Sequence, residues 1–263
     1  ACYTYPHMNR NTIVSVLILI IVIGGIVWYG ATRPAPQAPG SAQTATSTVP
    51  EMGPYTEHAS YYDIAANYPT STPLSTSADV AARAQMRAWI SDEIATFKQN
   101  GNFDNLTQND IQMMGYDQGR KETLDIKYLI ASSPRTVSYI YTEYLDTLGA
   151  HPNGFFKTFT FDTETGAFLS LADTFQRSSD YLSTLSRLSS AQLEQNMGDL
   201  AVPEMIADGT KPTEANFSNW FFDNGDFVLL FPPYQVAAYA AGPQNVRIPV
   251  STLKPHLMPA YQQ

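Results

Sequence analysis

The sequence predicts an α+β domain in which an antiparallel sheet packs against two main helices, preceded by one transmembrane helix and a disordered linker. Three features lead to this prediction. Segments in which apolar and polar residues alternate are joined by turns of hairpin length, which is typical of an antiparallel sheet. Two longer segments repeat their apolar residues at helical spacing. An uncharged apolar run near the N-terminus precedes a stretch rich in Pro, Ala, Ser and Thr.

The uncharged run at 13–29 has the length of a membrane span. As a helix it would be roughly 26 Å long, close to the ~30 Å of hydrocarbon in a bilayer. Trp28 and Tyr29 stand where interfacial aromatic side chains are expected. We therefore expect a short N-terminal segment at 1–12 and, at 13–29, an anchor whose partner is the lipid bilayer.

A cleaved signal peptide is the alternative for this run, because residues 9–11 form a short positively charged segment before it. The uncleaved anchor is favoured, since the run is longer than the apolar part of most signal peptides and 28–31 make a poor cleavage site. Arg10 and Arg33 flank the run almost evenly, so the positive-inside rule decides little about orientation. Met8 resembles a natural start, and we interpret residues 1–7 either as a misreading of the sequence upstream of that start or as a cloning remnant.

Residues 30–56 contain few charged or large apolar residues and are interpreted as a flexible linker to a domain at 57–263. The single cysteine, Cys2, leaves that domain without a disulfide. Residues 57–263 carry 13 Lys and Arg against 23 Asp and Glu, a formal charge of −10. This excess argues against nucleic acid as a partner and favours a basic one, although the same charge also keeps a domain soluble.

The first half of the domain is expected to run strand, helix, strand, strand. Residues 61–68 alternate weakly and end before a proline. A helix is predicted over 77–101, with Ser77 as N-cap and Gly101 as the left-handed residue after its end. Residues 102–119 are polar and expected to be a loop or a short helical turn. The apolar stripe predicted to pack this helix on the core comprises Met86, Trp89, Ile90, Ile94 and Phe97.

Period-two patterns continue over 122–130 and 136–145, where the tyrosines of the second strand are able to line either face. The elements expected next are a third strand at 155–161, a turn at 162–166 with a strand returning to 173, and a helix over 180–198. A hairpin follows at 219–231 around Asn224-Gly225, with a last strand at 247–250.

His151 is the one histidine within the patterned part of the domain. The sequence offers no metal-ligand spacing, no phosphate-binding glycine loop and no nucleophile elbow, so we predict no catalytic residue, metal or cofactor. Two interpretations of His151 remain. It is a loop histidine whose ring bonds backbone groups among turn-forming residues, which we favour, or it works with a nearby carboxylate. The carboxylates considered for such pairs are those of Asp146, Asp162, Glu164 and Asp173.

A second unusual stretch, 231–243, combines prolines, small alanines and the two tyrosines Tyr234 and Tyr239. Tyrosine hydroxyls need partners when buried and give an amphipathic surface when exposed. This stretch is either a binding surface or a loop packed over the end of the sheet. The ligand-binding candidates of the chain are His151, Asn153, Tyr234 and Tyr239, and one shared ligand requires that they converge on an open groove.

Several of these segments together resemble a known family. They are Gly149-Ala150-His151-Pro152-Asn153, residues 156–162 with Thr165-Gly166, residues 231–234, and Ala240-Ala241-Gly242-Pro243. The chain over about 61–254 resembles the extracytoplasmic domain of lysozyme-responsive anti-sigma factors of the RsiV type, a domain of otherwise unknown function. That domain is also found beside peptidoglycan deacetylase domains. Leu148 is a departure, since family members often carry glycine there.

The resemblance implies a single-pass protein of the cytoplasmic membrane whose C-terminal domain is extracytoplasmic. It implies a binding or sensor domain for a cell-envelope ligand, either a lysozyme-like basic protein or peptidoglycan. We expect neither the sigma-binding segment of the anti-sigma members nor the metal-dependent catalytic domain of the deacetylase members. The alternatives are a small cell-wall hydrolase or deacetylase using His151 with a nearby carboxylate, and a structural envelope protein without a soluble ligand.

Overall fold

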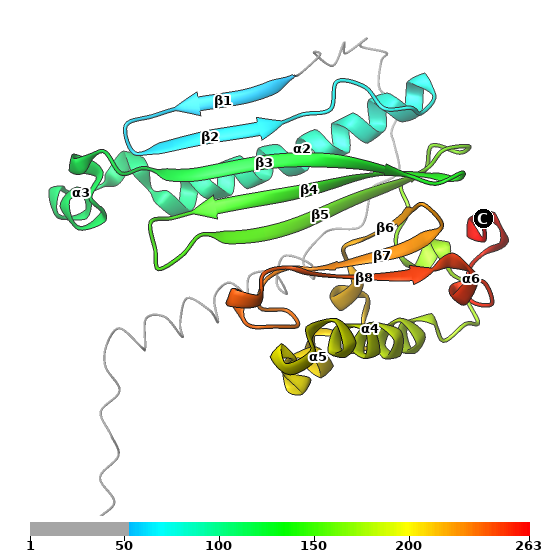
Figure 1. The fold of residues 1–263 in the computed structure, drawn as a ribbon. Coiled ribbons are helices and arrows are strands. Elements are labelled where there is room, and N and C mark those ends of the chain that lie inside the picture. Colours follow the sequence, from blue (N-terminus) through cyan, green and yellow to red (C-terminus); the bar gives the residue numbers. More distant parts are fainter. Residues whose placement is uncertain (1–52) are drawn as a thin grey trace, which may run out of the picture. The chain divides into compact units, whose positions relative to one another are not determined.

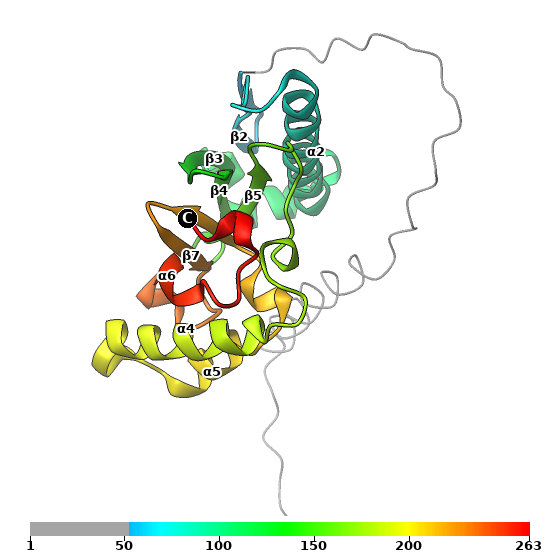
Figure 2. The same cartoon turned by 90° about the vertical axis from the view of Figure 1, so that its right-hand side faces the viewer.

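Two β-sheets pack against each other between helices in residues 53–263, the part of the chain that the computed structural model describes (Figures 1 and 2). Helix α2 (Thr76–Gly101) covers the outer face of the first sheet, and helix α4 (Tyr181–Met197) covers the outer face of the second. The order of layers is therefore helix, sheet, sheet, helix. The α+β class and the two main helices are confirmed.

None of the helices within residues 53–263 combines the length and the apolar character that a membrane crossing requires. The predicted segment at 1–12, the anchor at 13–29 and most of the predicted linker lie outside the described residues.

The first sheet has five strands in the order of the chain, and every neighbouring pair except one is antiparallel. Strands β2 and β3 pair in parallel, which the sequence prediction missed. The helices between them carry the chain back to the end of the sheet where β2 began, as a parallel connection requires. The strands are β1 Pro54–His58, β2 Tyr62–Asn67, β3 Glu122–Ser132, β4 Thr136–Asp146 and β5 Asn153–Asp162.

Strand β1 begins inside the predicted linker 30–56, so that boundary was wrong by a few residues. The strand is held by Glu57, whose carboxylate accepts hydrogen bonds from Tyr55 and, at 2.6 Å, from Tyr62 on β2. Lys98 near the end of α2 pairs with the same carboxylate at 2.5 Å. The first strand of the domain is therefore attached both to its neighbour and to the covering helix.

Helix α2 buries one stripe of side chains at spacings of three and four residues, as its sequence predicts. It begins one residue before the predicted N-cap, after Ser75, and Asn102 rather than Gly101 takes the left-handed conformation at its end, with φ of 48°. Gly101 is needed for space instead, since a Cβ there would lie 2.2 Å from the ring of Phe103. The buried residues of the stripe are Ala82, Met86, Ile90, Ile94 and Phe97.

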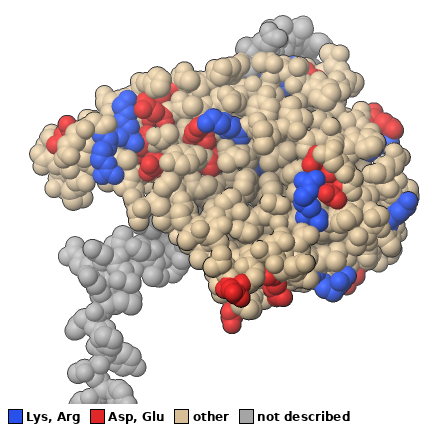
Figure 3. All heavy atoms as spheres, in the orientation of Figure 1, with Lys and Arg blue, Asp and Glu red and all other residues tan. Residues whose placement is uncertain are grey.

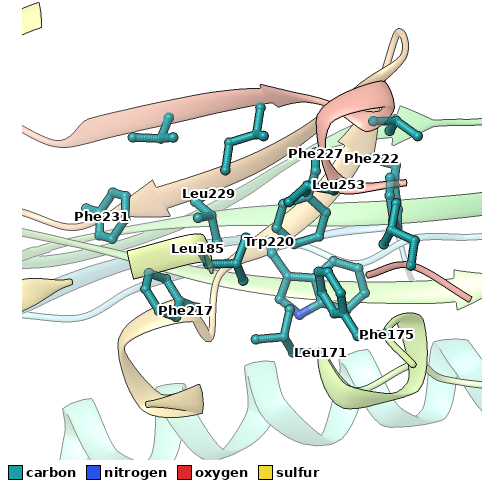
Figure 4. Packing of buried hydrophobic residues seen from close by; sticks show 14 of the residues in the cluster. Leu171, Phe175, Leu185, Phe217, Trp220, Phe222, Phe227, Leu229, Phe231 and Leu253 are labelled. Atoms are coloured by element: carbon teal, nitrogen blue, oxygen red, sulfur yellow. The ribbon is translucent and has the colours of Figure 1, made fainter. Parts of the chain in front are cut away.

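The second sheet has three antiparallel strands around the predicted Asn224-Gly225 turn, where both residues have positive φ. Its core is almost entirely hydrocarbon, and Figure 4 shows Phe175, Trp220 and Phe227 packed closely within it. The strands are β6 Trp220–Asp223, β7 Asp226–Phe231 and β8 Gln244–Pro249.

Three shorter helices of the described chain were not predicted as such. They are α3 Gln108–Met114, α5 Pro203–Gly209 and α6 Val250–Leu253.

The prediction of a single sheet was wrong, because β6 does not extend the ladder beyond β5. Instead, side chains of β5 bond the backbone of β6: the Trp220 amide donates to Thr158 Oγ1 at 3.2 Å, and Thr160 Oγ1 donates to the Trp220 carbonyl at 3.4 Å. The strand expected up to 173 is also missing, since residues 167–173 form only one isolated bridge and the start of a short 3-10 helix. The outer edge of β8 is occupied by Gln192 of α4, which accepts from the Arg247 amide at 2.8 Å and donates to its carbonyl at 3.2 Å.

Candidate functional site

Two loops meet at one end of the paired sheets: residues 147–152 between β4 and β5, and residues 232–243 between β7 and β8 (Figure 1). His151 Nε2 lies 2.9 Å from the hydroxyl oxygen of Tyr234. The imidazole also stacks on Tyr239, with ring centroids 3.8 Å apart and planes at 20°. The structure therefore brings together three of the four predicted ligand-binding candidates.

The Pro152 carbonyl determines the protonation pattern of this cluster. It accepts one hydrogen bond from His151 Nδ1 at 3.0 Å and another from the Tyr239 hydroxyl at 2.7 Å. Because a carbonyl oxygen only accepts, Nδ1 carries the proton, and in the neutral ring Nε2 accepts from Tyr234. Both ring nitrogens are thus used to join the loops, and the interpretation of His151 as a loop histidine that bonds backbone agrees with this geometry.

Two residues of these loops adopt backbone conformations that side chains disfavour. Tyr234 has φ of 72° and Leu148 has φ of 59°. Glycine adopts such angles without a steric cost, so Leu148 occupies a backbone position that suits glycine better. The conformation at Tyr234 places its side chain at the surface, 54% exposed, with its hydroxyl still on His151.

The loop that carries Tyr234 and Tyr239 is also held by hydrogen bonds to helix α5 and the segment after it. Gln235 Nε2 donates to the carbonyls of Gly209 and Asn216, each at 2.9 Å. Gly209 is required there, because a Cβ would lie 2.1 Å from the Gln235 carbonyl oxygen. Helix α5 and the segment after it therefore support the loop that presents the tyrosines.

An open cleft of about 330 Å³ lies beside the histidine cluster. Its floor is the face of β4 and β5 turned toward the second sheet, and its wall is the loop between β7 and β8. The lining is mostly apolar, with the Asn153 amide among its few polar groups. The floor includes Thr142, Tyr144, Gly154 and Phe156, and the wall includes Pro233, Tyr239, Ala240 and Pro243.

Two of the predicted candidates, Asn153 and Tyr239, line this cleft. His151 and Tyr234 do not line it, but they fix the position of Tyr239 and of the loop above it. Sequence reasoning missed Tyr144 and Phe155, each 43% exposed and both lining the cleft. The alternation of β4 and β5 places Tyr144 and Phe155 on opposite faces of the sheet, so it did not indicate that both line one cleft.

Three of the four carboxylates considered as partners for His151 are engaged in turns, and the fourth, Glu164, pairs with Arg135. Asp162 accepts from the amides of Glu164 and Thr165, at 3.0 and 2.8 Å, as its predicted turn role requires. Asp173 accepts from the Ser170 amide, and Asp146 from the Leu148 amide. Among the described residues neither ring nitrogen of His151 contacts a carboxylate.

Two other carboxylates, which the sequence analysis did not select, are buried in the first sheet. Glu143 is 8% exposed on the face of β4 that packs against α2. Burial, with repulsion from Glu93, raises the pKa of Glu143 to about 7. Glu122 at the start of β3 is 5% exposed. Across residues 53–263, no group of three or more His, Cys, Asp or Glu side chains is arranged to hold a metal ion.

Comparison with known proteins gives a partial match. Residues 172–251 match a family described as a protein of unknown function, DUF3298. The chain is 34% identical over 143 residues to the peptidoglycan-N-acetylmuramic acid deacetylase PdaC of Bacillus subtilis strain 168. That alignment covers 54% of this chain and 31% of the relative, so the chain spans less than a third of the relative's length.

The fold itself has a crystallographic counterpart. A member of the DUF3298 family from Bacteroides fragilis NCTC 9343 superposes with a TM-score of 0.55 at 16% identity, covering 78% of this chain and 91% of that one. A DUF3298 family protein from Pseudomonas aeruginosa PAO1 gives a TM-score of 0.45 at 12% identity, covering 76% of this chain and 85% of that one. The second sheet and its helices thus carry the DUF3298 match, and the chain has a homologue named for peptidoglycan deacetylation.

Proposed function

We propose that this chain is a membrane-anchored extracytoplasmic binding or sensor domain, related to the RsiV-type domain, which binds a cell-envelope ligand at the cleft beside His151. The observation that carries the proposal is the cleft itself, an open apolar groove with exposed aromatic side chains whose loops are joined by His151, Tyr234 and Tyr239. Positioned aromatic residues around a partly desolvated groove are typical of binding hot spots.

A lysozyme-like basic protein is the ligand we favour. The charge of −10 over residues 57–263 attracts basic partners from solution. Figure 3 shows acidic and basic side chains interspersed over one face rather than gathered into a patch of one sign. Electrostatics is therefore expected to speed association, while the aromatic cleft supplies the contact.

Peptidoglycan is the second candidate for the ligand. It is supported by the homologue named for peptidoglycan deacetylation and by the aromatic and amide groups of the cleft, which suit a sugar. The two candidates differ in their expected response to salt. Binding to a basic protein weakens as salt screens the charges, whereas stacking of sugars on aromatic rings does not depend on long-range charge.

The test is calorimetric titration of residues 53–263 with lysozyme, at about 0.05 M and about 0.5 M salt, beside a pull-down on purified peptidoglycan. Tyr239→Ala removes a lining residue and is expected to weaken binding about 30-fold. Leu200→Ala is the control. Leu200 lies just after helix α4, is 75% exposed and does not line the cleft, so this variant is expected to bind as wild type. Absence of binding in both assays, or equal binding by the two variants, would overturn the proposal.

The anchor is tested separately on the full chain. If 13–29 spans the membrane, the protein stays in the membrane pellet after alkaline carbonate extraction, and deletion of 13–29 releases it. Protease added from outside to intact cells is expected to remove the C-terminal domain. Release of the full chain by carbonate, or protection of the domain from external protease, would contradict this part of the proposal.

The alternative is a small hydrolase or deacetylase that uses His151, and the named relative is the observation in its favour. It predicts that His151→Ala abolishes turnover of a muropeptide while the fold is kept. The binding proposal predicts no turnover by the wild type. Since His151 joins two loops through both ring nitrogens, we expect His151→Ala to reduce stability and ligand affinity together.

A further inference from the structure

A second cavity, of about 350 Å³, lies at the same end of the five-stranded sheet as the first cleft but on its opposite face. Leu145 lines the second cavity and Tyr144 lines the first, and neighbouring residues of a strand point to opposite faces. The walls come from the end of α2, from α3 and from the start of β3. They include the apolar side chains of Phe97, Leu106 and Met114.

A buried carboxylate lies in this cavity. Glu122 lines it and is only 5% exposed. The hydroxyl of Tyr116, another lining residue, donates to Glu122 Oε1 at 2.6 Å. Among the residues that the structure describes, no donor bonds the second oxygen, Oε2. Half of the hydrogen-bonding capacity of the carboxylate is therefore available to an occupant.

The described residues that line the cavity offer Glu122 no compensating positive charge. The cavity is lined by Asp110 as well as Glu122, and by no Lys, Arg or His. The adjoining lysines are engaged elsewhere, Lys98 with Glu57 at 2.5 Å and Lys121 with Asp63 at 3.1 Å. Burial raises the pKa of Glu122 and the charge of Asp146 adds to this, against the hydrogen bond from Tyr116, which lowers it. A cation placed in the cavity would relieve this cost.

We propose that this cavity binds a primary alkylammonium group on an unbranched carbon chain, of which the lysine side chain of a protein or peptide partner is the commonest form. The ammonium group would donate to Glu122 Oε2 and to the oxygen of Tyr116. The methylene chain would lie against Leu106, Met114 and Leu145, and the ring of Phe97 suits a cation at its face. The proposal stands independently of the first cleft and its ligand.

Three chemical features separate this occupant from others. An apolar ligand would leave Glu122 Oε2 without a donor, which is costly in a buried place. An anion would meet the carboxylates of Glu122 and Asp110. A guanidinium group is planar and wider than an ammonium, and its forked donors fit two free carboxylate oxygens better than one.

The experiment is an NMR titration of residues 53–263 with Nα-acetyl-lysine N-methylamide, and in parallel with the norleucine analogue, which has the carbon chain without the charge. We expect saturable shifts at the amides of Tyr116, Glu122 and Gly101 with the lysine compound, and binding of the norleucine compound at least about tenfold weaker. Equal binding of the two compounds, or no saturable shift with the lysine compound, would overturn the proposal.

Two variants make the result specific to the cavity. Glu122→Gln keeps the shape of the side chain and removes its charge. It is expected to weaken binding of the lysine compound at least about tenfold. Leu106→Trp adds bulk to a wall of the cavity and leaves Glu122 in the sequence, and it is also expected to weaken binding of the lysine compound. Glu194→Gln removes an exposed carboxylate on α4 and is the control, expected to bind as wild type. Wild-type affinity of both cavity variants for the lysine compound would assign the binding to another site and overturn the proposal. Each variant is shown to be folded by a Tm equal to that of the control.

Discussion

The two sheets differ in what they bury. Strands of the five-stranded sheet bury three carboxylates, those of Glu122, Glu143 and Asp162. Between residue 172 and the C-terminus of the described chain, the buried polar side chains are hydroxyls only: Thr174, Ser189 and Thr210. The buried carboxylates of the described chain therefore lie in the first sheet. The second sheet is a hydrocarbon scaffold that supports the loop bearing Tyr234 and Tyr239.

This contrast means that the two layers should respond to different perturbations. Stability of the second sheet depends mainly on apolar volume, so it should be sensitive to truncation and less sensitive to pH than the first sheet. Stability of the first sheet should also depend on pH, because its buried carboxylates bind protons differently in the folded and unfolded chain.

The largest effect is expected from Phe227→Ala in the second sheet. Phe227 is 0% exposed and its ring stacks on Trp220 with centroids 5.6 Å apart. Loss of the ring should lower the free energy of unfolding by about 3–5 kcal/mol, measured by urea titration. Trp220 reports the second sheet and Trp89 the first, so single-tryptophan versions show whether both layers unfold together. A loss below about 1 kcal/mol would mean that this core tolerates a cavity.

A somewhat smaller effect, which grows as pH rises from about 4.5 to about 7, is expected from Glu143→Gln. The pKa of Glu143 is raised to about 7, above the ordinary 4.5, so the folded chain binds the extra proton between these values. The stabilisation is complete below about pH 4.5 and is lost as pH rises through about 7, an effect on the order of 3 kcal/mol. The glutamine variant should be the more stable protein at about pH 8, and a parallel pH profile of the two proteins would contradict the assignment.

The opposite sign is expected for Asp162→Asn. Burial alone would raise the pKa of Asp162, but hydrogen bonds from Arg135, the Thr165 amide and Tyr261 outweigh it and lower the pKa to about 2. Its stabilisation is present above the ordinary carboxyl range and is lost as pH falls from about 4 to about 2. The variant should lose about 2 kcal/mol at neutral pH and match wild type near pH 2, by thermal or urea unfolding. Equal stability at neutral pH would contradict this.

The smallest effect concerns the contact between loops of the two layers. Tyr234→Phe removes the donor to His151 Nε2 and should cost about 0.5–1 kcal/mol, since Tyr234 is well exposed. The ring should keep its proton on Nδ1, because the Pro152 carbonyl still accepts it. Long-range nitrogen–proton NMR correlations identify the tautomer directly. If the wild-type protein shows the Nε2-protonated form of His151, the hydrogen-bond pattern described above is wrong.

Local features of the chain were predictable from its sequence, and its layering was not. Helices α2 and α4 and the Asn224-Gly225 hairpin follow from spacing and turn chemistry that act within about ten residues. Whether β6 extends the sheet at β5 or packs across it depends on contacts some 60 residues apart, such as Thr158 with Trp220. Alternating patterns do not encode that choice.

The candidate site was predictable in part. Gly, Pro and Asn residues marked the loops around His151 and Tyr234, but their meeting depends on the packing of the two sheets. Glu122 and Glu143 fall in the same alternation as the apolar residues of their strands, in phase with Leu124 and Tyr141. A carboxylate at an apolar phase of a strand is therefore a usable signal for buried charge, although it belongs to no motif.

The contact between Gln192 and Arg247 has a consequence for assembly. An outermost strand offers unpaired amides and carbonyls to which another polypeptide can add. By bonding both backbone groups of Arg247, the Gln192 amide acts as a one-residue substitute for a neighbouring strand at the middle of β8. Recruitment of another chain by strand addition is thereby blocked at this edge, and replacement of Gln192 by alanine would open a template for aggregation.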